Sequence, residues 1–140
     1  MPKPNPVVVV VEDDIVDLEA LLRGIKKRNL QYEIHHKQSA ESAIASLEGD
    51  GFSPEQRENL IVILDINMPS MNGHQFLESI RNSVTLRRTI IFVLTTSNDV
   101  NDKAKAYDKN IAGYFVKSNV SGLLDTVALY LENVEFPPFE

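Results

Sequence analysis

The stretch Val7-Val8-Val9-Val10-Val11-Glu12-Asp13-Asp14 places three acidic residues directly after five consecutive valines. An unbroken run of β-branched residues is typical of a parallel-sheet strand that is covered on both faces. A second apolar run, Leu60–Leu64, has the same character and ends in Asp65. The two runs predict interior strands of a parallel α/β sheet, each with carboxylates at its end.

Two further runs extend this pattern along the chain. The apolar run at residues 90–94 is followed by Thr95 and Thr96, and the run at residues 114–116 is followed by Lys117. Around Tyr32 and Ile34, apolar and polar residues alternate, which is typical of a half-exposed edge strand. Apolar residues recur at helical spacing over residues 15–25, 40–47, 76–80, 100–107 and 120–133. Residues 49–59 are interpreted as a surface loop.

The strict alternation of strands and helices predicts the architecture. Parallel strands need right-handed crossover connections, and here a helix is available for each crossover. We therefore expect a doubly wound, five-stranded parallel sheet with five helices, in the flavodoxin-like order 2-1-3-4-5. One domain should cover residues 7–134, with an N-terminal extension at 1–6 and a C-terminal tail at 135–140.

The composition excludes several classes of protein. The 140 residues carry a net charge of −6 and contain no cysteine. Disulfides, a thiolate nucleophile and a zinc–cysteine site are thereby excluded, and the reducing cytoplasm is the expected location. The apolar runs are only as long as strands, so we expect no membrane span and no signal peptide. The basic cluster Arg23, Lys26, Lys27 and Arg28 is too small for a nucleic-acid surface, so we expect no direct nucleic-acid binding.

The polar residues that end the strands should lie close together. The carboxyl ends of parallel strands share one edge of the sheet, and open α/β sheets bind ligands there. Acids combined with a hydroxyl and a single lysine indicate a divalent cation and a phosphoryl group. Taken singly, each residue also has a structural explanation: acids cap helices or form turns, a threonine can end a strand, and a lysine can be solvated. His35 and His36 are interpreted as surface and packing residues.

Four segments resemble, in order, the motifs of the response-regulator receiver domain of two-component signalling. They are Val9-Val10-Val11-Glu12-Asp13, Leu64-Asp65-Ile66-Asn67-Met68-Pro69 followed by Gly73, Val93-Leu94-Thr95-Thr96-Ser97, and Gly113-Tyr114-Phe115-Val116-Lys117. The resemblance covers nearly the whole chain. The Thr-Thr-Ser and Lys-Ser variants, the long loop at 49–59 and the absence of an output domain most resemble the small single-domain regulators of cyanobacterial and bacterial phytochromes.

The resemblance implies a phosphoacceptor and a metal site. Asp65 is the expected nucleophile, which takes the phosphoryl group from a phosphohistidine. Asp13, Asp65 and the backbone carbonyl of Asn67 are the expected Mg²⁺ ligands, and Glu12 is expected to act through a metal-bound water. Oxygen donors of this kind are those that Mg²⁺ prefers, and Mn²⁺ or Ca²⁺ could substitute.

The resemblance also assigns residues to phosphoryl binding and switching. Lys117 pairs with a phosphoryl oxygen, the Thr95 hydroxyl bonds another, and the Tyr114 ring follows the movement of Thr95. The lifetime of the phosphoryl group should depend on side chains beside it, which are Asn67, Thr96 and Ser97. Ser118 stands where receivers commonly carry a proline after the lysine, and both a cis and a trans peptide bond stay open at that point.

The implied function is that of a stand-alone response regulator phosphorylated by a sensor histidine kinase, with a phytochrome as the candidate kinase. Such a protein is not an enzyme, because it catalyses only its own phosphorylation and dephosphorylation. An intermediate receiver, which passes the phosphoryl group to a histidine phosphotransfer protein, stays open as an alternative. A haloacid-dehalogenase-like phosphatase is disfavoured, because its second aspartate would stand at Asn67. An unphosphorylated receiver-like module is disfavoured, because no acid, nucleophile or lysine is missing.

The C-terminus carries more apolar residues than one helix face needs. On a helical wheel Leu129 lies nearly opposite the apolar stripe of helix 120–133, Tyr130 flanks the stripe, and Phe136 and Phe139 follow in a proline-rich tail. This surplus predicts a homodimer through the fourth helix, the fifth strand and the fifth helix, the face through which phytochrome-linked lone receivers pair. A tail folded back on its own domain is the alternative.

Overall fold

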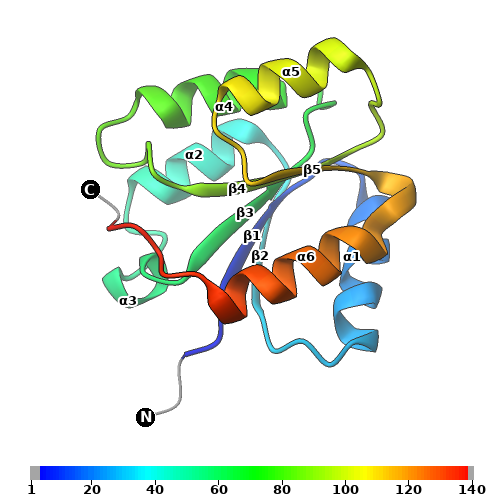
Figure 1. Cartoon of the computed structure of the whole chain (residues 1–140). Helices are drawn as coiled ribbons and strands as arrows, with labels where there is room; N and C mark the ends of the chain where they lie inside the picture. The colour runs from blue at the N-terminus through cyan, green and yellow to red at the C-terminus, as the bar shows by residue number, and fades with distance from the viewer. Residues whose placement is uncertain (1–3, 139–140) are drawn as a thin grey trace.

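The strands form one parallel sheet in the predicted order. A computed structural model describes residues 4–138 and places the strands as β2-β1-β3-β4-β5, with β3 at the centre between β1 and β4 (Figure 1). The strands are β1 (Val7–Val11), β2 (Glu33–Lys37), β3 (Leu60–Leu64), β4 (Ile90–Thr95) and β5 (Gly113–Val116). The doubly wound order 2-1-3-4-5 is thus confirmed, and β2 is the half-exposed edge strand that its alternation predicts.

Helices cover both faces of the sheet and bury two separate apolar layers. Successive side chains of a strand point to opposite faces, so Val7, Val9 and Val11 enter one layer while Val8 and Val10 enter the other. The first layer lies under α2 (Ala40–Glu48), α4 (Gly73–Asn82) and α5 (Val100–Asp108). The second lies under α1 (Ile15–Lys27) and α6 (Val120–Asn133), which pack side by side (Figure 1). Every residue of β1 and β3 is buried, which explains their unbroken apolar sequences.

Side-chain caps set where the helices begin. Asp14 accepts hydrogen bonds from the backbone N–H groups of Val16 and Asp17 at the start of α1. Asn72 and Gln75 form a reciprocal capping box at the start of α4. The helices α1, α2, α5 and α6 begin three to five residues after the strands that precede them, so the strand ends and helix N-termini stay at one edge of the sheet. The fourth short connection is that from β5 to α6 through a 3₁₀ turn, η1 (Lys117–Asn119).

The segment 49–59 is not a plain loop. It contains a sixth helix, α3 (Pro54–Arg57), so the structure has one short helix more than predicted. Ser53 and Gln56 cap it reciprocally, and Pro54 occupies its first turn, where a missing N–H costs nothing. These signals are readable in the sequence, but a four-residue helix has no apolar stripe to reveal it. Phe52 anchors the segment in the first layer.

The chain after β5 follows a trans path. No peptide bond within residues 4–138 is cis, so Lys117-Ser118 is trans, and Lys117 opens the turn η1. A serine after the lysine is therefore accommodated by this turn. No helix in the described part of the chain is long and apolar enough to span a membrane.

The tail after α6 folds back along its own domain. The ring of Phe136 lies edge-on to Tyr130, with centroids 6.3 Å apart, and Tyr130 in turn lies edge-on to the buried Phe92 at 5.3 Å. Both aromatic residues belong to the second apolar layer as partly buried members. Phe139 lies outside the described residues. The folded-back tail, kept open as an alternative, is thus present in the single chain.

The close packing of Gly73 against the backbone of Ile66 can be tested by substitution. A Cβ atom at this position would lie 2.3 Å from the Cα of Ile66, because the Gly73 N–H bonds the Ile66 carbonyl at 3.1 Å. The backbone cannot yield as a side chain can, so Gly73→Ala should lower the free energy of unfolding by roughly 1–3 kcal/mol. Urea denaturation measures this change.

The matched control is Gly24→Ala in α1. There the added Cβ would meet two side-chain ends and no backbone atom: Leu124 Cδ1 at 2.8 Å, which can rotate away, and Val120 Cγ1 at 3.7 Å, an ordinary contact. Alanine also favours the helix by about 1 kcal/mol over glycine. Gly73→Ala with unchanged stability would contradict the close approach of Gly73 to Ile66.

Candidate functional site

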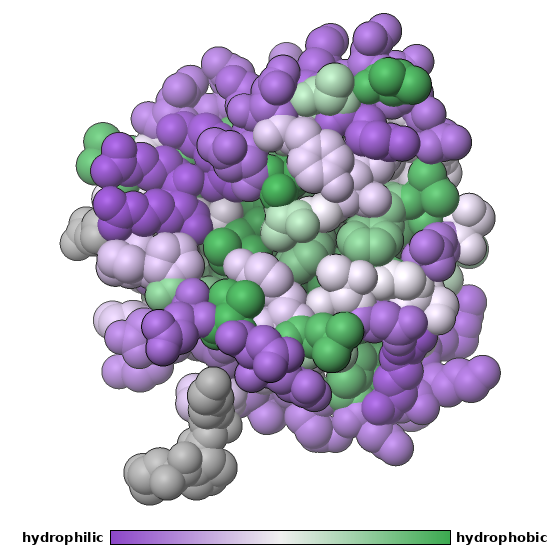
Figure 2. All heavy atoms as spheres, viewed as in Figure 1, coloured by the Kyte–Doolittle hydropathy of each residue, from purple (hydrophilic) through white to green (hydrophobic). Residues whose placement is uncertain are grey.

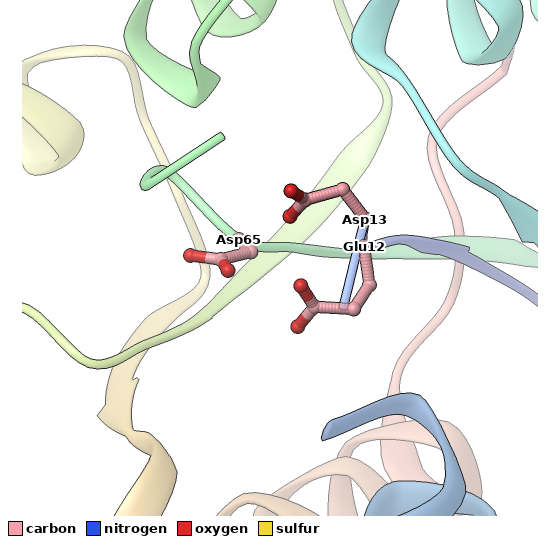
Figure 3. A group of neighbouring side chains, drawn as sticks. All are labelled: Glu12, Asp13 and Asp65. Atoms are coloured by element: carbon pink, nitrogen blue, oxygen red, sulfur yellow. The ribbon is translucent and has the colours of Figure 1, made fainter. Parts of the chain in front are cut away.

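Three carboxylates converge at the carboxyl ends of β1 and β3. Glu12 and Asp13 directly follow β1, Asp65 directly follows β3, and the two strands are adjacent and paired in register. One oxygen from each of the three lies within 4.8 Å of the others, and Figure 3 shows the Glu12 and Asp13 carboxylates turned toward Asp65. Glu12 and Asp65 are buried, whereas Asp13 is exposed. The parallel register thus brings together acids that are more than fifty residues apart in sequence.

Lys117, which directly follows β5, also reaches this group of acids. Its ammonium nitrogen lies 2.8 Å from Asp65 Oδ2, 2.7 Å from Glu12 Oε1 and 2.6 Å from Asp17 Oδ2. Burial by itself lowers the pKa of Lys117, but the hydrogen bonds to Asp17, Asp65 and Glu12 outweigh burial and raise its pKa. Lys117 therefore stays charged near neutral pH, with all three of its donors directed at carboxylates.

One lysine does not balance the acids around it. Burial, aided by the nearby Asp65 charge, raises the pKa of Glu12 from 4.5 to about 7, although the Lys117 hydrogen bond opposes this shift. Part of the carboxylate charge is therefore uncompensated by protein groups. A cluster of oxygen donors with excess negative charge fits a hard divalent cation such as Mg²⁺ or Mn²⁺.

The loops after β3 and β4 lie against each other beside Asp65. The backbone N–H of Asn67 donates to Asp65 Oδ1 at 2.9 Å, and the Asn67 side-chain amide donates to Thr96 Oγ1 at 3.1 Å. Thr95 is fully buried at the end of β4, and its Oγ1 accepts from the Ser97 N–H at 3.4 Å. Asn67, Thr95 and Thr96 therefore flank the acid cluster as a connected unit.

Ser97 and Tyr114 connect instead to the helix α5. The Ser97 hydroxyl donates to Asp102 Oδ2 at 2.6 Å, and its carbonyl accepts from the Tyr114 hydroxyl at 2.9 Å. His74 on α4 reaches the other Asp102 oxygen at 3.1 Å. The bonds from Ser97 and His74 lower the pKa of Asp102, so it accepts from both as a carboxylate. The hydrogen bonds of Ser97 thus lie on the side of α5, while Tyr114 is half-buried against the first layer.

Sequence reasoning missed two neighbours of the site. Asp17 contacts Lys117, but an acid in the first turn of a helix is equally explained by the helix dipole, so its sequence position did not reveal the contact. His36, interpreted as a packing residue, places Nε2 2.7 Å from the Glu12 backbone carbonyl. His35 pairs with Glu33 at 2.7 Å, an acid two residues away that alternation on one strand face should have revealed.

The structure exposes one of the predicted dimer residues and packs two others against the domain. Leu129 is 62% exposed, whereas Tyr130 and Phe136 contact each other on the domain itself. Figure 2 shows apolar and weakly polar residues gathered over the middle of the face formed by α5, β5 and α6, with hydrophilic residues around them. The face is thus available to a partner at Leu129, and already occupied in part by the tail.

A family model described as the response regulator receiver domain matches residues 8–128. The chain belongs to this family. The match begins within β1 and ends within α6, so it spans the sheet, the acid cluster and Lys117.

Individual relatives cover nearly the same length. The response regulator Rcp1 of Synechocystis sp. is 30% identical over 140 residues, which are 96% of this chain and 95% of Rcp1. The crystal structure of Rcp1 in its Mn²⁺-bound form aligns with a TM-score of 0.78 at 25% identity, covering 94% of this chain and 99% of that one. The phosphorylated cyanobacterial phytochrome response regulator RcpA shares the fold, with a TM-score of 0.77 at 22% identity over 96% and 99% of the two chains.

The raised pKa of Glu12 makes stability depend on pH. Between pH 4.5 and about 7 the folded protein binds the Glu12 proton more tightly than the unfolded chain does, so this group destabilises the metal-free protein as pH rises through that window. The melting temperature of metal-free wild type should fall more steeply between about pH 5 and about pH 8 than that of Glu12→Gln, which cannot ionise. Circular dichroism melts measure both slopes.

Mg²⁺ provides the internal control for this test. The cation favours ionised carboxylates, so millimolar Mg²⁺ should restore the wild-type melting temperature mainly at the alkaline end. Identical pH slopes for wild type and Glu12→Gln would show that Glu12 does not carry the effect.

Proposed function

We propose that this protein is a stand-alone response regulator that accepts a phosphoryl group from a histidine kinase on Asp65, in a reaction that requires Mg²⁺. The observation that carries the proposal is the position of Asp65, which is buried among Glu12 and Asp13 and hydrogen-bonded to Lys117 at 2.8 Å. A nucleophile, a set of oxygen donors and a fixed positive charge are the parts that phosphoryl transfer needs.

In the proposed reaction an Asp65 carboxylate oxygen attacks phosphorus in line with the leaving group. A P–O bond forms on Asp65, the P–N bond to the kinase histidine breaks, and the imidazole nitrogen leaves with the bond's electron pair and takes up a proton. Lys117 neutralises charge on the phosphoryl oxygens, and the backbone N–H of Asn67 orients the nucleophile through Oδ1.

Asp13, Asp65 and the Asn67 backbone carbonyl would hold the metal, with Glu12 acting through a bound water. When bound, the cation supplies positive charge opposite the equatorial oxygens of the transferring group. The Mn²⁺-bound form of Rcp1 supports a divalent site in this family, while Mg²⁺ as the working ion is our proposal. Asn67 contributes an amide where a haloacid-dehalogenase-like phosphatase would need an acid, which disfavours turnover as an enzyme.

The switch is proposed to pass through Thr95 to the face formed by α5, β5 and α6. A phosphoryl oxygen would draw the Thr95 hydroxyl toward Asp65, and Tyr114 would follow into the space behind it. Because Tyr114 bonds the Ser97 carbonyl and Ser97 bonds Asp102, that movement would be transmitted to α5. Asn67 and Thr96, in contact with each other beside Asp65, are proposed to set the phosphoryl lifetime by limiting access of water, together with Ser97.

A phytochrome-type histidine kinase is the proposed phosphoryl donor. The likeness to the cyanobacterial phytochrome response regulator RcpA, along almost the full length of both chains, supports this link. A cytoplasmic location, expected from the absence of cysteine, belongs to the same proposal.

The first test of the function is Asp65→Asn. Wild type incubated with acetyl phosphate and Mg²⁺ should gain one phosphoryl group per chain by intact-mass measurement, and chelation by EDTA should abolish the gain. Asp65→Asn should remain folded and unlabelled, because an amide oxygen is a poor nucleophile. Asp50→Asn, at an exposed acid beyond the C-terminal end of α2, is the matched control and should label as wild type does. Labelling of Asp65→Asn at the wild-type level would refute the assignment.

We further propose that the chain forms a homodimer through α5, β5 and α6. Val100, Tyr107 and Leu129 are large apolar residues exposed by half or more on these helices. Tyr130, Phe136 and Phe139 are proposed to join them; Tyr130 and Phe136 pack edge-on against each other in the single chain, and Phe139 lies outside the described residues. Exposed apolar residues gathered on one face are typical of an interface.

The dimer is tested at Leu129. Sedimentation at micromolar concentration should show a two-chain species for wild type, and Leu129→Glu should shift it to the monomer, because a buried unpaired carboxylate is costly. Val84→Glu, at a residue that is 75% exposed between α4 and β4, is the control and should leave the dimer intact. A monomer at every concentration, with and without phosphorylation, would remove the proposal.

A further inference from the structure

Asp17 shares the Lys117 ammonium with the two buried acids of the cluster. Its Oδ2 lies 2.6 Å from Lys117 Nζ, closer than Glu12 at 2.7 Å and Asp65 at 2.8 Å. The three acids come from different elements, since Asp17 lies in the first turn of α1 while the others end β1 and β3. The lysine is therefore tied to α1 as well as to the sheet.

Helix capping does not explain this contact. The N-cap of α1 is Asp14, whose side chain already accepts from the N–H groups of Val16 and Asp17. The Asp17 carboxylate points instead to Lys117, whose side chain is only 12% exposed. An ion pair that is partly buried and shared with two further acids differs from the solvated surface pairs that contribute little to stability.

Asp17 differs from the other two partners in what phosphorylation would do to it. The Lys117 bond to Asp65 must be exchanged for one to a phosphoryl oxygen, and Glu12 is expected to face the metal-bound water. Asp17 has neither task, so its bond to Lys117 can persist throughout. A lysine has a flexible four-carbon stem and recognises phosphate as a point charge, so its position must be held by other groups.

We propose that Asp17 is a positioning residue, which holds the Lys117 ammonium at the phosphoryl site while the lysine exchanges its bond from Asp65 to the incoming phosphoryl group. This inference rests on the proposed function. A displacement of a charged group by about 1 Å can slow a reaction by about a hundredfold, so loss of one of three anchors should slow phosphoryl transfer measurably.

The experiment compares three variants in rate of labelling by acetyl phosphate and Mg²⁺. Asp17→Ala removes the acceptor and should slow labelling by about tenfold. Asp17→Asn keeps an oxygen acceptor but removes the charge, and should stay within about threefold of wild type. Glu19→Ala removes one acid from an exposed position of the same helix and should leave the rate unchanged. Equal loss in Asp17→Asn and Asp17→Ala, or no loss in Asp17→Ala, would overturn the positioning role.

A second readout separates positioning from general damage to the fold. Mg²⁺ affinity, measured by calorimetry, should change by less than about threefold in Asp17→Asn and Asp17→Ala, because Asp17 is not an expected ligand. A parallel loss of melting temperature, Mg²⁺ affinity and labelling would mean that Asp17 is merely structural. A wild type that is never labelled would overturn the proposed function instead, without bearing on the Asp17 contact.

A third measurement needs no substitution. NMR can detect scalar coupling across the hydrogen bond between Lys117 Nζ and the Asp17 carboxyl carbon. The coupling should be present in the metal-free protein and should persist when Mg²⁺ and beryllium fluoride, a phosphoryl mimic, are added. Its absence in either form would overturn the inference.

Discussion

The balance of charge around Lys117 is the interaction on which the functional edge of this structure depends. One ammonium group holds carboxylates from the end of β1, the end of β3 and the first turn of α1, all within 2.8 Å. Without it, Glu12 and Asp65 would be buried beside each other with no protein cation between them, an arrangement that costs several kcal/mol. The lysine therefore stabilises the site, but its hydrogen bond does not outweigh the burial of Glu12 and the nearby Asp65 charge, which together raise the pKa of Glu12 to about 7.

Because Lys117 neutralises the carboxylates only in part, the same charges affect both the stability of the protein and the ligands that its site can bind. A site that were fully neutralised by protein groups would have no reason to bind a divalent cation, and a site with no lysine would have nothing to direct at a phosphoryl oxygen. The apolar layers on both sides of the sheet keep the acids and the lysine close together, because the buried valines and leucines of β1 and β3 prevent the strand ends from separating. Packing far from the site thus sets the distances within it.

The edge of the sheet that carries these charged groups is connected by hydrogen bonds to α5 and to α1. Thr95 lies buried at the end of β4, and the bonds from Ser97 to Asp102 and from Tyr114 to Ser97 lead from it to α5. On the other side, Asp17 links Lys117 to α1. A charge added at Asp65 would thus bear on the helices of both faces of the sheet, in keeping with the general rule that local charge changes act through elements packed against them.

The sequence by itself determined the strand order and the identity of the acids and lysine that meet at one edge, because β-branched runs, crossover handedness and strand ends are local or topological properties that leave clear patterns. Tertiary structure alone decided the rest. Asp17 and His36 join the site through contacts across the fold, α3 is too short to carry a periodic signal, and the direction of the tail depends on Phe136 finding Tyr130. The peptide bond before Ser118 is trans because the turn η1 accommodates it, and no pattern in the sequence distinguishes that path from its alternative. Such features depend on which side chains meet in space. The sequence shows which contacts are chemically possible, but only the tertiary structure shows which of them form.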